Sequence, residues 1–428
     1  MLSVPVILIA CLVIFLFWNL PVGIAIGFAT LCSLVGGESI SLSSVPQAMV
    51  NACDSFPILA VPMFILAGDL MGAGGVSRRI LNVCNVFFGR ITGGIAIVTV
   101  LVCMFFAAVS GSGPATVAAV GSMVIPTMIE LGYKRSFALA LVATAGTIGV
   151  IIPPSIPMVL YGVSTGASVV SLFTAGIVPG IFIGAALMLY AYVFSKLNGY
   201  TGNKEPFSWK VAGAAVWDAK WALINPVIIL GGIYCGIFTP TEAAAVAVIY
   251  AFLCGTVIHR ELPLKKLYET IATSSCTTGT ILVILATASA FSKVLTVEQI
   301  PELITEAIIS VTDNKILLLL LINVLLLIVG CFMDQTPAIL ILAPILLPIA
   351  QSIGVDPVHF GIIMVCNLAI GFITPPLGMA LFVAARVSNS KLEVVLKGII
   401  PFLLIMITCL MFITYIPEIS MFLPNLMK

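Results

Sequence analysis

Charged residues are scarce in this chain of 428 residues. They make up 8% of it, whereas hydrophobic residues make up 61%. A soluble globule carries about 25% charged residues to keep its surface solvated, so a soluble fold is excluded. The apolar runs approach the roughly 20 residues that a membrane-crossing helix needs, and no alternating pattern of a barrel is present. The composition therefore predicts an all-α polytopic membrane protein.

Residues that carry enzyme chemistry are also few. The chain has two histidines, His259 and His359, and its eleven cysteines are scattered singly without a CxxC spacing. A metal centre or a histidine-based catalytic group would need clusters of such side chains. We therefore expect no enzyme activity and no bound cofactor, and we interpret the cysteines as small packing residues.

Two further signatures are missing. The glycine-rich stretches 72–75 and 110–113 lack the Gly-Lys-Ser/Thr ending of a phosphate-binding loop, so ATP is not expected as an energy source. No basic cluster interleaved with aromatic residues is present, so no nucleic-acid partner is expected. An ion gradient is the energy source that remains.

The chain does contain an internal repeat of interrupted helices. The sequence Gly-Val-Ile-Ile-Pro-Pro at 149–154 recurs as Gly-Phe-Ile-Thr-Pro-Pro at 371–376, an offset of 222 positions (371 − 149). Two upstream pairs keep this offset, Pro126 with Pro348 and Gly132 with Gly354. Paired prolines interrupt a helix, and repeated discontinuous helices indicate the midplane site of a secondary transporter. We expect the two broken helices at 135–164 and 357–386.

Each half also contains a pair of apolar segments joined by a tight polar tip. The pairs span 91–130 and 315–351, with tips at 110–116 (Ser-Gly-Ser-Gly-Pro-Ala-Thr) and 334–337 (Asp-Gln-Thr-Pro). Polar backbone at membrane depth is tolerated only where protein or a cavity surrounds it. We therefore interpret both pairs as re-entrant hairpins.

The distribution of charge gives the predicted topology. If both hairpins return to the side they entered, three lysines (Lys293, Lys315 and Lys428) lie on one face. The other fifteen basic residues share the opposite face: Arg78, Arg79, Arg90, Lys134, Arg135, Lys196, Lys204, Lys210, Lys220, Arg260, Lys265, Lys266, Arg386, Lys391 and Lys397. By the positive-inside rule the crowded face is cytoplasmic, which places both termini in the periplasm. The first half then crosses the membrane five times. Because this number is odd, the second half starts from the opposite side of the membrane, and the two halves are inverted repeats.

The predicted domain organisation follows this symmetry. Residues 1–195 form the first inverted repeat, and residues 221–428 form the second. Residues 196–220, which carry lysines and tryptophans, are expected to be a linker arm at the cytoplasmic membrane interface. The tips of the two hairpins are expected to converge near the middle of the membrane.

The first half offers uncharged oxygen ligands. Hydroxyls and freed carbonyls of the first tip are expected to face the first broken helix, through Ser110, Ser112, Gly113, Thr116, Thr144 and Thr147. Such ligands suit a desolvated alkali cation, and helix N-termini suit a carboxylate. The simplest pair is Na⁺ with an organic anion. The residues expected to contact the anion are Ser112, Pro154, Ser155, Thr336, Pro337 and Pro376.

The second half offers a carboxylate. Asp334, Gln335 and Thr336 at the tip are expected to meet Asn367 and Thr374 of the second broken helix in a second cation site. An ionisable side chain inside a membrane indicates a functional site, because its burial is costly unless it is paired. A structural alternative is that Asp334 caps the helix that begins at Thr336 and Pro337. The two interpretations are compatible.

Three other carboxylates have structural interpretations. Glu242 belongs to Thr-Pro-Thr-Glu at 239–242, a capping box with proline in the first turn. Asp69 is expected to form an interfacial salt link near Arg78 and Arg79. Asp54 is expected to cap the helix that follows it.

These motifs together resemble the large membrane subunit of TRAP transporters, the tripartite ATP-independent periplasmic family. The resemblance covers essentially the whole chain and depends on Ser-Gly-Ser-Gly-Pro-Ala-Thr at 110–116, Ile-Pro-Pro-Ser at 152–155, Gly-Ile-Phe-Thr-Pro-Thr-Glu-Ala-Ala at 236–244 and Thr-Pro-Pro-Leu-Gly at 374–378. It implies an elevator-type fold of the ion transporter superfamily type, in which hairpins and broken helices move against a scaffold. It also implies Na⁺ symport of an organic acid, such as a sialic acid or a C4-dicarboxylate, across the bacterial inner membrane.

The resemblance further implies two protein partners. One is a small four-helix membrane subunit, expected as a separate chain because the extra N-terminal helices of fused forms are absent here. The other is a soluble periplasmic protein that binds the substrate and delivers it.

Four other functions fit the sequence less well. A single-component Na⁺-coupled carboxylate permease of related fold would show Ser-Asn-Thr tips, which are absent. A channel would show charged rings or a wide pore rather than paired hairpins. A membrane enzyme lacks its catalytic clusters, and a purely structural subunit would not need polar tips at the midplane.

Overall fold

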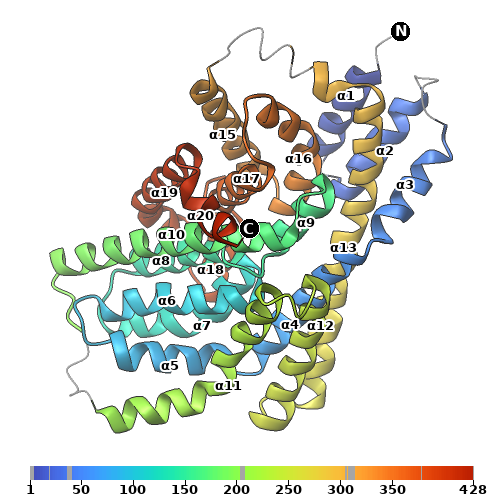
Figure 1. The fold of residues 1–428 in the computed structure, drawn as a ribbon. Coiled ribbons are helices and arrows are strands. Elements are labelled where there is room, and N and C mark those ends of the chain that lie inside the picture. The colour runs from blue at the N-terminus through green and yellow to red at the C-terminus, as the bar shows by residue number, and fades with distance from the viewer. Residues whose placement is uncertain are drawn as a thin grey trace.

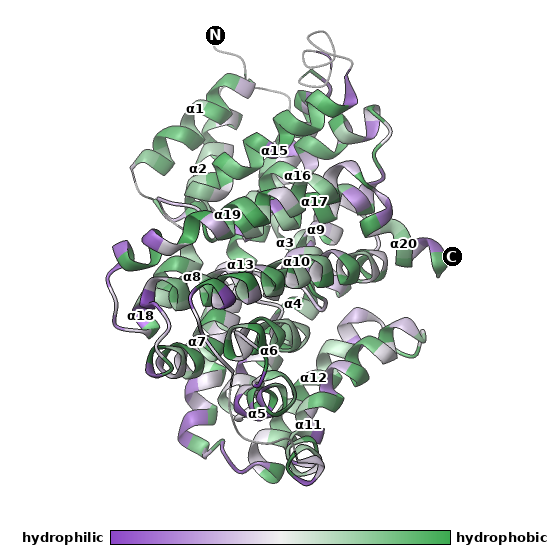
Figure 2. Ribbon diagram, turned by 90° about the vertical axis from the view of Figure 1, so that its left-hand side faces the viewer, coloured by the Kyte–Doolittle hydropathy of each residue, from purple (hydrophilic) through white to green (hydrophobic). Residues whose placement is uncertain are grey.

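The computed structural model describes residues 4–18, 20–35, 41–202, 208–303, 306, 314–376 and 378–427. Within these ranges the regular structure is entirely helical. Eight of the described helices are long and apolar enough to cross a membrane. Hydrophobic residues run along most helices, and hydrophilic residues gather mainly at helix ends and connections (Figure 2). The prediction of an all-α polytopic membrane protein is confirmed.

The helices follow one another in two series. The first is α1 (Val4–Phe17), α2 (Val22–Val35), α3 (Ser44–Cys53), η1 (Phe56–Leu59), α4 (Ala60–Ala73), α5 (Val76–Phe88), α6 (Gly94–Ser110), α7 (Gly113–Glu130), α8 (Arg135–Thr147), η2 (Ile148–Val150), α9 (Ile156–Thr165) and α10 (Val169–Leu197). The second is α11 (Trp209–Tyr234), α12 (Pro240–Leu253), η3 (Cys254–Ile258), α13 (Leu264–Val297), α15 (Lys315–Phe332), α16 (Gln335–Ser352), α17 (Pro357–Gly371), α18 (Met379–Val387), α19 (Leu392–Tyr415) and α20 (Glu418–Leu426).

Both hairpins and both discontinuous helices are present, so the predicted fold class is confirmed. The hairpins are α6 with α7 and α15 with α16. The first broken helix stops at Val150 and resumes at Ile156, and the second stops at Gly371 and resumes at Met379. The Pro-Pro bond is cis in each break. Leu377 of the second motif lies outside the described residues.

Helix α13 is the longest described element and runs along one side of the molecule (Figure 1). It packs against α2, α3 and α4, and it also contacts α16 of the second hairpin. The sequence predicted a shorter apolar segment, 276–292. The helix begins twelve residues earlier, and in this added part the hydroxyls of Thr270, Thr273 and Ser274 donate to carbonyls four residues back.

The expected linker arm at 196–220 also takes a more regular form. Helix α10 continues to Leu197, and α11 begins at Trp209 and extends unbroken to Tyr234. Helix α11 lies beside α5, and Arg79 of α5 is 3.7 Å from Asp218 of α11 and 2.8 Å from Glu261. Short helices α3, α5 and α20 were not anticipated, because their apolar runs are too short to stand out.

Two carboxylates, Glu242 and Asp54, were expected to take part in capping helices, and only Glu242 does so. Thr239 and Glu242 form the predicted capping box of α12, with the Glu242 carboxylate accepting from the Thr239 N–H at 2.8 Å. The expectation for Asp54 is wrong. Asp54 follows the last residue of α3, and Ser55 precedes η1, because the chain inserts a separate helix before the proline at Pro57.

Glycine allows the second broken helix to approach its hairpin closely. A Cβ on Gly371 of α17 would lie 2.6 Å from both the Cα and the carbonyl oxygen of Gly330 on α15. The Cβ atom of any other residue does not fit at that separation, so the contact between α15 and α17 requires glycine.

We expect Gly371→Ala to destabilise the protein by about 1–3 kcal/mol, because the added methyl group forces α15 and α17 apart. The measurement is the midpoint of thermal unfolding in detergent. Gly231→Ala in α11 is the matched control, since no atom lies within 4 Å of its Cβ position. Equal midpoints for the two variants would contradict the close-contact interpretation.

Candidate functional site

The two hairpin tips meet at one cavity, which we call the tip cavity. Its volume is about 330 Å³. Ser110, Gly111 and Ser112 line it from the first tip, and Asp334, Gln335 and Thr336 line it from the second. Its remaining wall includes Val150 and Phe372 from the two breaks, Asp69 from α4, and Thr273 and Thr277 from α13. Predicted site residues of the two hairpin tips therefore line the same cavity.

The first tip is held by bonds among its own polar groups. The Thr116 hydroxyl lies 2.8 Å from the Ser112 carbonyl oxygen, to which it donates, and 3.0 Å from the Ser110 hydroxyl. Ser110 and Thr116 are almost completely buried. These bonds compensate for the loss of regular helix at the tip, since unpaired polar groups in hydrocarbon would cost several kcal/mol.

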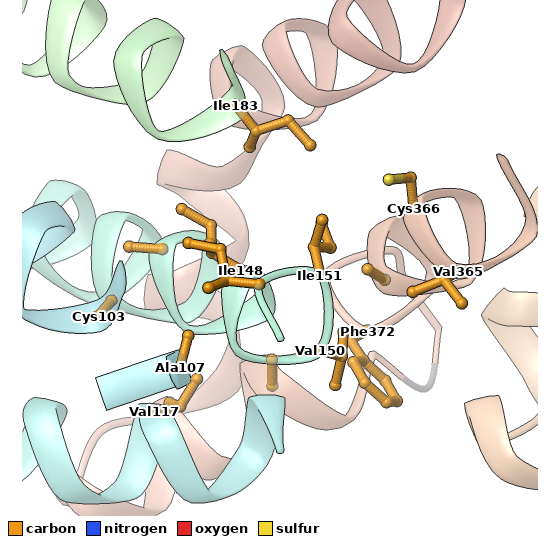
Figure 3. Close-up of a cluster of buried hydrophobic side chains, with 14 of the residues drawn as sticks. Cys103, Ala107, Val117, Ile148, Val150, Ile151, Ile183, Val365, Cys366 and Phe372 are labelled. Atoms are coloured by element: carbon orange, nitrogen blue, oxygen red, sulfur yellow. The ribbon is translucent and has the colours of Figure 1, made fainter. Parts of the chain in front are cut away.

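The first tip also packs directly on the first break. Gly111 has a φ of +61°, and a Cβ there would lie 2.8 Å from the Pro154 carbonyl oxygen. A Cβ on Gly149 would lie 2.9 Å from the Ser112 carbonyl oxygen, so both glycines are required by close approach. Around this contact, Ile148, Val150 and Ile151 are buried among apolar residues of α6, α7, α10 and α17 (Figure 3).

The second tip and the broken helix α17 each contain a side-chain oxygen atom that lacks a partner. The Gln335 side chain donates from Nε2 to the Val365 carbonyl at 3.1 Å, and its Oε1 has no described hydrogen bond. The Asn367 amide donates to the Asn323 carbonyl and to Asn323 Oδ1, at 3.0 and 2.7 Å, and its own Oδ1 is also unpaired. Both side chains are at least 98% buried. Buried orphan carbonyl oxygens are the ligands that a bound cation would satisfy.

Two carboxylates line the tip cavity, and its described lining contains no Lys, Arg or His. Asp334 is the N-cap residue of α16, and its carboxylate lies beside the N–H groups of Gln335 and Thr336. Asp69 accepts a hydrogen bond from the Ser274 hydroxyl of α13 at 2.6 Å. The expected salt link of Asp69 with Arg78 or Arg79 is wrong, because Arg79 turns to Asp218 and Glu261 instead.

Other predicted site residues lie behind the cavity wall. The Thr144 and Thr147 hydroxyls are fully buried and donate to carbonyls within α8, and Thr374 donates to the Ile370 carbonyl. Ser155 caps α9 by accepting from the Met158 N–H. The residues of the predicted set that are absent from the described cavity lining are Gly113, Thr116, Thr144, Thr147, Pro154, Ser155, Pro337, Asn367, Thr374 and Pro376.

Sequence reasoning missed the contribution of the scaffold helices to this site. Asp69, Thr273 and Thr277 face the tips from α4 and α13, and Asn323 of α15 orients Asn367. One signal was available for the threonines, since 273 and 277 are one helical turn apart. No local pattern places Asp69 beside a tip that follows it by about 40 positions.

Comparison with known proteins identifies the family. The family model "Tripartite ATP-independent periplasmic transporter, DctM component" matches residues 9–419. The chain belongs to the TRAP transporter family. This permease subunit is 43% identical to the C4-dicarboxylate TRAP transporter large permease protein of Pseudomonas aeruginosa, over 90% of each chain. It is 36% identical to the sialic acid TRAP transporter large permease protein of Vibrio cholerae, over 96% of each chain.

A more similar relative is longer than this TRAP subunit. The isethionate TRAP transporter permease protein of Oleidesulfovibrio alaskensis is 51% identical over 96% of this chain, which spans 64% of the length of that relative. Among solved structures, the YdaH transporter of Alcanivorax borkumensis matches with a TM-score of 0.60 at 16% identity, covering 84% of each chain. MtrF of Neisseria gonorrhoeae matches with a TM-score of 0.57 at 13% identity, covering 88% of this chain and 85% of that one. These likenesses show a transporter fold.

We expect Thr116→Val to destabilise the TRAP subunit by about 1–3 kcal/mol, because the Ser112 carbonyl loses the hydroxyl that donates to it. Thermal unfolding in a Na⁺-free K⁺ buffer is the measurement, so that any loss of ion binding does not contribute. Thr116→Ser keeps the hydroxyl and should stay close to wild type. If valine and serine behave alike, the hydroxyl does not hold the tip.

Proposed function

We propose that this subunit carries out Na⁺-coupled uptake of an organic acid. The observation that supports this most strongly is the charge of the tip cavity, which contains Asp69 and Asp334 without a described basic residue. An organic anion placed beside two carboxylates would be repelled. Bound cations would remove this repulsion, so anion and cation would enter the cavity together.

The geometry offers separate groups for each ion. Helices α7 and α16 begin at the tips, and their N-termini carry positive partial charge. They suit the carboxylate or sulfonate of the substrate. The orphan oxygens of Gln335 and Asn367, with Asp334 beside them, suit a cation in the second half. The Ser112 carbonyl and the hydroxyls around it suit a cation in the first half.

The names of the relatives suggest the substrate class. They are named for isethionate, for C4-dicarboxylates and for sialic acid, which all carry a carboxylate or a sulfonate. We propose a small organic acid of this kind, with isethionate as the first compound to test because the relative named for it is 51% identical. The proposed partners are a small membrane subunit and a periplasmic binding protein. The proposed location is the bacterial inner membrane, with both termini in the periplasm.

A single-component carboxylate permease is the second candidate. The fold alone is compatible with it, because solved transporters of this fold match at 16% and 13% identity. Dependence on a binding protein distinguishes the two functions.

The proposed function is tested by uptake into proteoliposomes that contain this subunit and its small partner. The labelled acids are isethionate, succinate and N-acetylneuraminate, each with and without the cognate binding protein. We expect uptake of at least one acid that requires both an inward Na⁺ gradient and the binding protein. Uptake driven equally by K⁺ would refute the coupling, and uptake without the binding protein would favour the single-component carrier.

We expect Asp334→Asn to raise the Na⁺ concentration for half-maximal uptake on the order of tenfold, because an amide attracts a cation less than a carboxylate does. Asp356→Asn is the matched control. Asp356 is likewise an N-cap residue followed by a helix in the second half, but it lies outside the tip cavity and caps α17 through Val358 N–H. Identical Na⁺ dependence in both variants would exclude Asp334 from the cation site.

A further inference from the structure

A second cavity lies farther along α13, again between this helix and the second hairpin. We call it the Lys293 cavity. Its volume is about 450 Å³, and it is lined by α3, α9, α13 and α16, with Ser289, Ser292, Lys293 and Thr296 contributed by α13. Leu340 and Pro344 of the second hairpin form the opposite wall.

The two cavities are neighbours along two helices. On α13, Ile281 lines the tip cavity and Leu285 lines the Lys293 cavity, one helical turn away. On α16, Thr336 and Leu340 stand in the same relation. Leu285 and Leu340 are each 3% exposed, so a thin apolar contact separates the cavities.

The two cavities have opposite charge. The tip cavity contains Asp69 and Asp334, whereas Lys293 is the one charged residue in the described lining of the other. The Lys293 side chain is exposed and forms no ion pair within the described parts of the chain. Ser289, Ser292 and Thr296 line the same cavity within four residues of Lys293, and the Ser289 and Thr296 hydroxyls donate to the carbonyls of Ala48 and Ser292. An ammonium group without an ion partner in a polar cavity attracts a carboxylate or sulfonate.

We propose that the Lys293 cavity is an outer binding station for the organic anion, at which Lys293 attracts the substrate before the tips enclose it. This rests on the proposed function and on the predicted topology, which places Lys293 on the periplasmic side. From Ile281 to Lys293 the rise along α13 is about 18 Å. A hairpin tip that moves outward along α13 would approach Lys293. Helix α13 would then line the substrate's position both at the tip cavity and at the Lys293 cavity.

The first test needs no knowledge of the substrate. Thr296→Cys places an exposed thiol three residues from Lys293, and it is modified from outside with an anionic sulfonate thiol reagent or a cationic trimethylammonium one. Mass spectrometry of the peptide around position 296 separates this thiol from the eleven native cysteines. We expect Lys293→Gln to lower the ratio of anionic to cationic modification about fivefold at low salt.

Two variants control this experiment. Lys293→Arg keeps the charge and should keep the ratio. Lys315→Gln removes another lysine of the predicted outer face, at the start of α15 and outside the cavity, and should leave the ratio unchanged. An unaltered ratio in Lys293→Gln would overturn the proposal.

The second test measures uptake of labelled isethionate at low salt with the binding protein outside, which selects subunits whose outer face is accessible. We expect Lys293→Gln to raise the half-saturating concentration about fivefold, to keep the maximal rate, and to converge on wild type at high salt. Titration of the binding protein at saturating isethionate should be unchanged, which separates substrate capture from docking.

The outcomes distinguish this proposal from the proposed function. If the wild-type protein takes up none of the three acids, the proposed function fails, and the modification ratio alone decides on the anion station. If wild-type uptake is normal and Lys293→Gln matches it at every salt concentration, the station is overturned while the proposed function stands.

Discussion

The structure depends on one constraint: backbone polar groups freed inside a membrane must find partners within the protein. Each half of the chain interrupts a helix twice, at a hairpin tip and at a Pro-Pro break, and each interruption leaves N–H and C=O groups unpaired. The fold brings each hairpin against its own break. Gly149 meets the Ser112 carbonyl in the first half, and Gly371 meets Gly330 in the second. Glycine is needed in both places because a methyl group would prevent the two interruptions from shielding one another from lipid.

The fold was predictable because the repeat, the tips and the charge asymmetry are local or additive features of the sequence. Pro153 and Pro154 interrupt a helix wherever it packs, and the Ser110–Thr116 tip is too polar for hydrocarbon. The site was only partly predictable. Gln335 and Asn367 were expected to act together, and both have an unpaired buried oxygen. Asp69 was misjudged, because its distance from the basic residues in sequence is short, but its helix turns it towards Ser274 and the tips. Side-chain direction on a packed helix depends on tertiary contacts, which no local pattern reports.

The polar groups of the two halves differ in how completely they are hydrogen-bonded, and this difference has a physical consequence. The first tip satisfies its own polar groups through Ser110, Ser112 and Thr116, whereas the second leaves Gln335 and Asn367 oxygens without donors. A tip whose polar groups bond to one another is stable without a ligand. A tip with a carboxylate and orphan oxygens beside it would gain stability from the proposed cation. Under the proposed function, the second half is therefore the part of the cavity whose conformation would respond most to the ion.

The contact between α13 and α16 favours the proposed movement of the tips over an open pore. Leu285 and Leu340 close the contact between the cavities, and an unpaired ion crossing that contact would lose its hydration at a cost of several kcal/mol. Ions held at the tips would instead cross together with the groups that coordinate them. The surface of α13 that contacts α16 is also compatible with sliding. The described side-chain hydrogen bonds of α13 run to its own backbone, to α3 and to α4, while its contact with α16 is apolar, with Ile341 packed against the cluster of Phe291 and Val294. A sliding hairpin would therefore exchange one apolar contact for another without breaking these bonds.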